Sequence, residues 1–69
     1  MSNMIEGLVD QIDRVKRIRE TYMDLPDGVG IPAAVLMSKD LQKAREALSS
    51  MDAVDGLRAY EALKEWKDE

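Results

Sequence analysis

The stretch NMIEGLVDQIDRVKRIRETYMDL, residues 3–25, decides the fold because it predicts one long amphipathic helix. Its apolar residues recur every three or four positions, which places them on one face of a helix. Asn3 followed by Glu6 forms a capping box that satisfies free backbone N–H groups at a helix start. We therefore predict a helix over residues 3–24 with one face that must be covered. The apolar positions are Ile5, Leu8, Ile12, Val15, Ile18, Tyr22 and Leu25.

Residues 25–32, LPDGVGIP, interrupt this periodicity with prolines and glycines, which are typical of turns. We expect Val29 and Ile31 to fold back onto the core. Pro32 suits a first helical residue because its missing N–H has no helical partner there. A second helix is predicted over residues 32–50, with a 3-4-3-4-3 spacing that is typical of antiparallel helix packing. Its apolar positions are Ala34, Met37, Leu41, Ala44, Leu48 and Met51.

A third helix is predicted over residues 53–67. Asp52 is a good N-cap, and Asp55 favours the positive end of the helix dipole. Gly56 costs about 1 kcal/mol relative to alanine in a helix interior, which indicates close packing there. The predicted apolar face consists of Val54, Leu57, Ala59, Tyr60, Leu63 and Trp66. The fold class is therefore all-α, with a single domain over residues 1–69 in which an antiparallel helical hairpin packs against a third helix.

The short chain predicts self-association. A single core in so small a protein rarely supplies more than about 3–5 kcal/mol, and disulfides, metals or oligomerisation usually supplement it. The 69 residues include no cysteine and no histidine, which excludes a disulfide and disfavours a metal site. The first helix is also longer than the third, so part of its apolar face stays uncovered. We expect a homodimer through that helix, formed by Ile5, Leu8, Ile12 and Val15.

The residue inventory argues against an enzyme. Histidine is the usual general base near neutral pH, and the serines of this chain have none to activate them. The carboxylates lie mostly at predicted helix starts and do not form the ligand set of a calcium loop. We therefore expect no catalytic residues, no cofactor and no metal, and a function that depends on binding.

Charge and hydropathy narrow the choice of partners. The net charge of −4 disfavours direct binding to nucleic acid, whose phosphates attract basic surfaces. The longest apolar run, residues 31–37, contains Pro32 and is far shorter than the roughly 20 residues of a membrane span. The N-terminal residues do not resemble a secretory signal, and the absence of cysteine suits a reducing compartment. We expect a cytoplasmic protein, with no membrane association and with a protein partner.

The densest basic stretch lies on the first helix and is a candidate partner-binding surface. Arg14, Lys16, Arg17 and Arg19 could grip phosphates or an acidic protein surface. Alternatively they form a solvated face that pairs with acids three or four residues away. Tyr22 and Trp66 are the other candidate contacts, because tyrosine and tryptophan are enriched at binding hot spots.

The second half of the chain resembles small helical proteins encoded by phages and prophages. The stretch IPAAVLMSKDLQKAREALSSMDAVDGLRAYEALKE, residues 31–65, carries the resemblance through an alanine-rich helix start, an M-x3-L-x2-A spacing and an acidic break before L-x2-Y-x2-L. The matching residues are Met37, Leu41 and Ala44, then Asp52 and Asp55, then Leu57, Tyr60 and Leu63. These are packing motifs, so the resemblance transfers no active-site residue. It implies a phage origin, and many such proteins, anti-CRISPR proteins among them, bind and inhibit one host defence component.

Three functions remain open at this point. The first is a phage-type inhibitor that blocks a host defence component sterically, in the manner of anti-CRISPR proteins. The second is an oligomeric sponge that sequesters a small nucleotide signal with the basic residues and the turn at residues 28–32. The third is a structural or regulatory adaptor.

Overall fold

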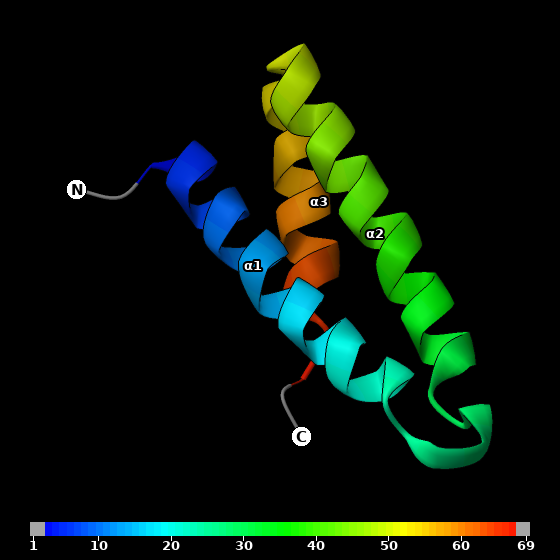
Figure 1. The fold of residues 1–69 in the computed structure, drawn as a ribbon. Coiled ribbons are helices and arrows are strands. Elements are labelled where there is room, and N and C mark those ends of the chain that lie inside the picture. The colour runs from blue at the N-terminus through cyan, green and yellow to red at the C-terminus, as the bar shows by residue number, and fades with distance from the viewer. Residues whose placement is uncertain (1–2, 68–69) are drawn as a thin grey trace.

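The computed structural model describes residues 3–67, which form three α-helices and one short 3-10 turn (Figure 1). The elements are α1 (Met4–Met23), η1 (Pro26–Gly28), α2 (Ile31–Ser50) and α3 (Ala53–Lys64). From the turn, α1 and α2 diverge as an antiparallel hairpin, and α3 packs into the angle between them. Every helix contacts both of the others, which confirms the predicted all-α three-helix bundle.

The core is apolar and draws on all three helices. Met37 and Leu41 of α2 and Leu63 of α3 are at most 1% exposed and lie at its centre. Alanines on α2 and α3 bring the backbones close together. The buried residues that complete the core are Leu8, Ile12, Val15, Ile18, Ala44, Ala47 and Ala59. Tyr22, Leu48, Tyr60 and Trp66 pack against it from the edge.

The start of α1 follows the predicted cap. The Asn3 side chain accepts a hydrogen bond from the Glu6 backbone N–H at 2.9 Å. The Asp52 side chain does the same for the Asp55 N–H at 3.0 Å, and α3 begins at Ala53 as predicted. These short side chains define where the two helices begin, because each satisfies a backbone donor that has no helical partner.

The turn between α1 and α2 differs from the prediction. Val29 and Ile31 do not fold back onto the core, and their side chains are 67% and 48% exposed. The residue between them, Gly30, is buried instead, because a Cβ atom there would overlap the Tyr22 carbonyl group. This close approach of backbone to backbone fixes the turn, and it directs both neighbouring side chains outward.

The buried face of α3 differs from the prediction only at its start. Ala59 and Leu63 are buried as predicted, and Tyr60 and Trp66 pack against the core. Val54 and Leu57 are instead 59% and 55% exposed, and Gly56 is buried. Close packing at Gly56 is confirmed, because a Cβ atom there would lie 3.2 Å from the Met4 Cε atom. Since α1 lies against this glycine, the helix buries its small residues and leaves Val54 and Leu57 on the outside.

The end of α3 comes at Lys64, three residues before the predicted Lys67. The Leu63 carbonyl accepts the Trp66 backbone N–H at 3.1 Å, which tightens the last turn. The same carbonyl accepts the Arg14 Nη2 at 2.9 Å. These two donors occupy the acceptor that Lys67 would need to continue the helix. As a result, α3 reaches only to the middle of α1.

Candidate functional site

The polar chemistry of the described residues lies at the surface. Among residues 3–67, no polar or charged side chain is fully buried, and no group of three or more acidic side chains could hold a metal ion. The sites that remain to be described are therefore surfaces and grooves, built from side chains that the three helices expose.

The predicted basic cluster on α1 divides into two kinds of residue. Arg14 is partly buried and donates both to the Leu63 carbonyl and, through Nε, to the Gln11 side chain at 3.0 Å. A cation at that carbonyl also favours the negative end of the α3 dipole. Arg19 is partly buried, whereas Lys16 and Arg17 are exposed. Arg14 therefore joins α1 to the end of α3, and Lys16 and Arg17 are the cluster members that lie free of such contacts at the surface.

The two aromatic candidates lie against the core. Tyr22 and Trp66 are both partly buried and pack on its edge. The Trp66 indole N–H donates to the Asp40 carboxylate at 2.9 Å, which ties the chain after α3 to the middle of α2. Their rings thus fill the fold in a chain with few large side chains, and they do not project as exposed anchors for a partner.

The residues predicted to form a dimer interface are mostly buried within one chain. Leu8, Ile12 and Val15 are 2%, 8% and 0% exposed, because α2 and α3 already cover them. Only Ile5 of the predicted set stays accessible, at 46%. Two copies could not use the first three residues without opening the bundle, so any contact between copies needs a different surface.

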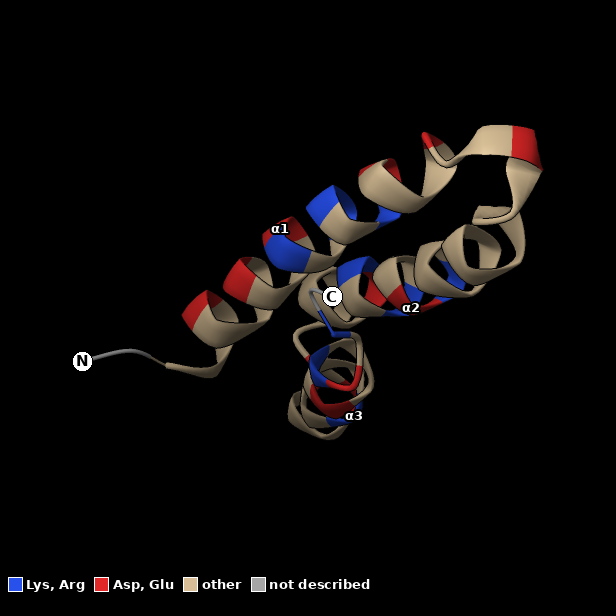
Figure 2. Cartoon of the chain, turned by 90° about the horizontal axis from the view of Figure 1, so that it is seen from below, with Lys and Arg blue, Asp and Glu red and all other residues tan. Residues whose placement is uncertain are grey.

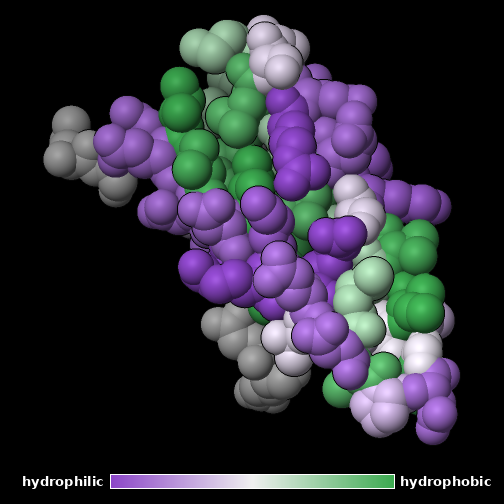
Figure 3. Space-filling view, in the orientation of Figure 1, coloured by the Kyte–Doolittle hydropathy of each residue, from purple (hydrophilic) through white to green (hydrophobic). Residues whose placement is uncertain are grey.

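Large apolar side chains are exposed at both ends of the bundle. Figure 3 shows them as two hydrophobic areas, one over the start of α1 and the top of α2 and one along the first half of α2, with hydrophilic residues between. The first area, called the acidic end below, exposes Met4, Ile5, Val9, Met51, Val54 and Leu57. The second, called the loop end, exposes Met23, Leu25, Val29, Ile31, Val35 and Leu36.

The acidic end contains a hollow where all three helices meet, called the end groove. It has a volume of about 170 Å³. All but one of the residues that line it are apolar or glycine; the exception is Asp52, which caps α3. The lining residues are Met4, Ile5, Leu8, Ala47, Leu48, Met51, Asp52 and Gly56. Such a hollow presents methionine and isoleucine side chains that can adapt to an apolar group.

Charge is strongly partitioned around this end. The segments that build it, residues 3–13 and 46–57, carry six acids and no lysine or arginine. In Figure 2 the first half of α1 accordingly shows acidic but no basic residues. The acids are Glu6, Asp10, Asp13, Glu46, Asp52 and Asp55, and all of them are exposed. On α1 the apolar residues of this end therefore lie among acids alone, whereas Glu46 and Asp55 share the groove between α2 and α3 with Lys43 and Arg58.

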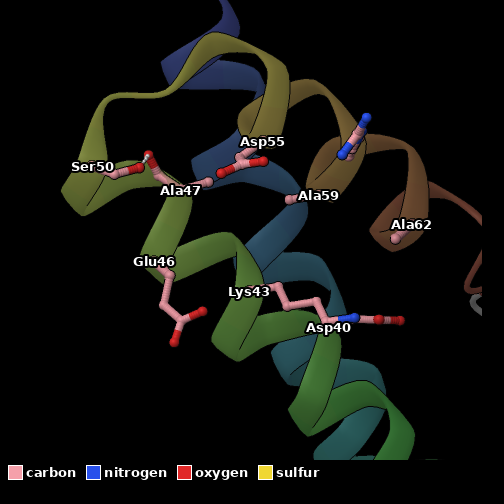
Figure 4. Close-up of a pocket in the computed structure, with 9 residues that line it drawn as sticks. Asp40, Lys43, Glu46, Ala47, Ser50, Asp55, Ala59 and Ala62 are labelled. Atoms are coloured by element: carbon pink, nitrogen blue, oxygen red, sulfur yellow. Dashed lines mark hydrogen bonds between the residues drawn. The ribbon is translucent and has the colours of Figure 1, made fainter.

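A second groove runs between α2 and α3 (Figure 4), with a volume of about 520 Å³. The small side chains of Ala47, Ala59 and Ala62 line this groove and leave it shallow. Acidic residues lie on its rim together with Lys43 and Arg58. Asp40 on this rim already accepts the Trp66 indole, and the Ser50 hydroxyl donates to the Ala47 carbonyl at 3.3 Å. Some polar groups on its rim are therefore already hydrogen-bonded within the chain, and the rim carries both positive and negative charges.

Comparison with known proteins gives no assignment: no protein-family model, no curated protein and no solved structure matches this chain. Within residues 3–67, no helix is both long and apolar enough to cross a membrane. The distinctive surface is the acidic end, which the sequence does not display because its residues come from two segments far apart in the chain.

Proposed function

We propose that this chain is a non-enzymatic binding protein that occupies a surface of one protein partner through the acidic end. The observation that carries the proposal is the set of large apolar side chains exposed there, up to 72% for Met51. Isolated exposed apolar residues are common, but Met4, Ile5 and Met51 gather around one groove, and an apolar group of this kind with a polar rim is typical of a protein-binding surface.

The proposed mechanism is steric block with fixed stoichiometry. An inhibitor of this kind needs shape, a few apolar anchors and a complementary charge pattern, and it needs no reacting group. Met4, Ile5 and Met51 supply the anchors, and the surrounding carboxylates supply the charge. The resemblance to phage proteins suggests the class of partner, namely a component of a bacterial defence system such as a CRISPR effector.

The experiment has two steps. The tagged chain is first used to capture proteins from a bacterial lysate, and mass spectrometry identifies any that bind in constant proportion. The purified partner is then titrated with the chain while its own activity is followed. We expect inhibition that saturates at a fixed molar ratio and is reversed when the chain is removed.

Two outcomes would contradict the proposal. One is the failure of any protein to bind in constant proportion. The other is inactivation of the whole partner pool by a much smaller amount of this chain, with the partner covalently altered, because that result requires turnover. A partner that binds stoichiometrically and keeps its activity would instead support the adaptor alternative.

The nucleotide-sponge alternative receives less support from the geometry. It requires the basic residues of α1 and the turn before α2 to converge on one anion. Arg14 is directed to the Leu63 carbonyl at the end of α3. It also lies nine residues before the end of α1, which is about 13 Å along a helix. The turn itself is shaped by the close contact of Gly30 with Tyr22.

Self-association is a separate part of the proposal and concerns the loop end. Two copies that met through their acidic ends would place carboxylates against carboxylates, which is destabilising. The loop end exposes Val35 and Leu36 beside Lys39, and acids at positions 24 and 27 lie in the neighbouring turn. Its mixture of charges suits a contact between identical surfaces, so we place the proposed dimer contact there.

A further inference from the structure

We infer that the end groove binds a basic amphipathic helix of the partner protein. This inference rests on the proposed function and specifies the chemistry of the bound segment. It depends on four features of the acidic end, namely the shape of the groove, its apolar rim, the sign of the surrounding charge and the exposed side chain of Met51.

The shape of the groove fits one large apolar side chain. Its volume of about 170 Å³ is close to that of a cavity of about 150 Å³ that holds benzene. Leu8, Ala47 and Gly56 lie at its base, and Met4, Ile5 and Met51 stand around it with exposed fractions from 41% to 72%. One anchor of a bound helix would enter the groove, and its neighbours three or four residues away would cover the exposed rim.

The charge around the groove favours a bound segment of positive charge. Asp52 lines the groove, and the first half of α1, which supplies Met4, Ile5 and Leu8 to it, carries exposed acids and no basic side chain (Figure 2). Lysine or arginine on the flanks of a bound helix would complement them, which raises the rate and specificity of association. A phosphate-rich surface, such as nucleic acid or an anionic membrane, would be repelled by the same carboxylates. A second copy of this chain would be repelled as well.

The secondary structure selects a helix over an extended segment. Residues 3–67 contain no β-strand, so this part of the chain offers no sheet edge to which an extended peptide could add. The end groove lies instead between helices, where a further helix can pack by the same rules as α3 does. A helix-in-groove contact is therefore the mode of recognition that this surface allows.

Met51 also favours a contact at this groove. It ends α2 in the left-handed conformation, with φ of 58°, which glycine adopts far more readily than a residue with a side chain. A left-handed residue is a common end for a helix, and here it is followed directly by Asp52, which caps α3. The Met51 side chain, 72% exposed at the rim of the groove, is accessible to a bound helix.

The test uses a fluorescein-labelled synthetic peptide made only of leucine and lysine, ordered so that a helix carries every leucine on one face. Fluorescence anisotropy measures its binding to the full chain. Two control peptides replace lysine with glutamate or scramble the order. We expect the amphipathic basic peptide to bind and each control to bind at least about tenfold more weakly, since the first loses the charge match and the second loses the apolar face.

Matched variants of the chain locate the site. The double reversal Glu6→Lys and Asp10→Lys removes exposed acids from the first half of α1, which supplies Ile5 and Leu8 to the groove, whereas Glu20→Lys and Glu61→Lys make the same change in net charge at exposed positions elsewhere. We expect the first pair to weaken binding about tenfold and the second pair less than about twofold, because distant charges are screened by salt. Circular dichroism of both double variants checks that the helices stay folded.

Met51→Gly separates binding from folding. Glycine relieves the left-handed conformation, so we expect the melting temperature to stay the same or rise while binding weakens about fivefold. The inference is overturned if the wild-type chain does not bind the basic peptide, if both pairs of reversals act equally, or if Met51→Gly binds as tightly as the wild type. Those results would leave the proposed function standing, because capture and titration of the natural partner test it separately.

Discussion

Arg14→Ala should destabilise the bundle far more than Arg17→Ala, although the two arginines lie one turn apart on α1. The Arg14 guanidinium donates to the Leu63 carbonyl at 2.9 Å and is partly buried, whereas Arg17 is exposed. A hydrogen bond from a charged group contributes about 1.5–3 kcal/mol, and we take the lower value because water can replace part of this contact. An exposed substitution such as Arg17→Ala changes stability by less than about 0.5 kcal/mol.

Thermal unfolding followed by far-UV circular dichroism measures the difference. For a chain of this size, each kcal/mol shifts the melting temperature by about 4–8 °C, so we expect a fall of about 6–12 °C for Arg14→Ala and under about 4 °C for Arg17→Ala. The Thr21 hydroxyl bonds to the backbone carbonyl of Arg17 and is unaffected by the second change. Equal shifts for the two variants would refute the assignment of Arg14 to the end of α3.

Three further predictions concern the core and the loop end. Trp66→Phe removes the indole donor to Asp40 and should cost about 1 kcal/mol, measured by urea unfolding; a loss no larger than that of an exposed substitution would contradict the contact. Leu8→Asp places a carboxylate where 2% of the residue is exposed and should unfold the chain; a native circular dichroism spectrum would disprove that burial. Leu36→Asp, at 54% exposure, should leave folding intact and convert the proposed dimer to monomer in sedimentation, an idea that a monomeric wild type at tens of micromolar would exclude.

The helices could be predicted from the sequence because their signals are local. The cap residues Asn3 and Asp52 lie one residue before the observed starts of α1 and α3, and the start of α2 differs from the prediction by one residue. Apolar spacing also identified the buried residues of α1 and most of those of α2. Both kinds of signal depend on neighbours three or four positions away, which a sequence displays directly.

The buried face of α3 could not be predicted in the same way, because it depends on another helix. Val54 and Leu57 share one helical face, and Gly56 and Ala59 share a second face that lies about 160° away at 3.6 residues per turn. Apolar spacing favours the first face, since its side chains are larger. The structure buries the second because Met4 of α1 packs against Gly56. Only the packing of α1 against α3 decides between them.

Two of the candidate partner residues have contacts within the chain that the sequence does not display. Trp66 and Arg14 belong to residue types that are common at interfaces, but both have polar partners within this chain, Asp40 and the Leu63 carbonyl. Those partners lie 26 and 49 residues away in the sequence, so no local pattern connects them. The sequence therefore does not distinguish Arg14 and Trp66, which the fold already occupies, from Lys16 and Arg17, which stay exposed.

The lengths of the helices explain one of the two apolar surfaces but not the other. The helices α1 and α2 have 20 residues each and span about 30 Å, whereas α3 has 12 residues and spans about 18 Å. Because the shorter α3 ends beside Arg14, it does not cover the loop end of the two longer helices. The acidic end has all three helices present, yet Val54, Leu57 and Met51 still face solvent there. Because the acidic end also contains the apolar end groove, it is the surface to which we assign the partner, and the loop end is the surface to which we assign a second copy.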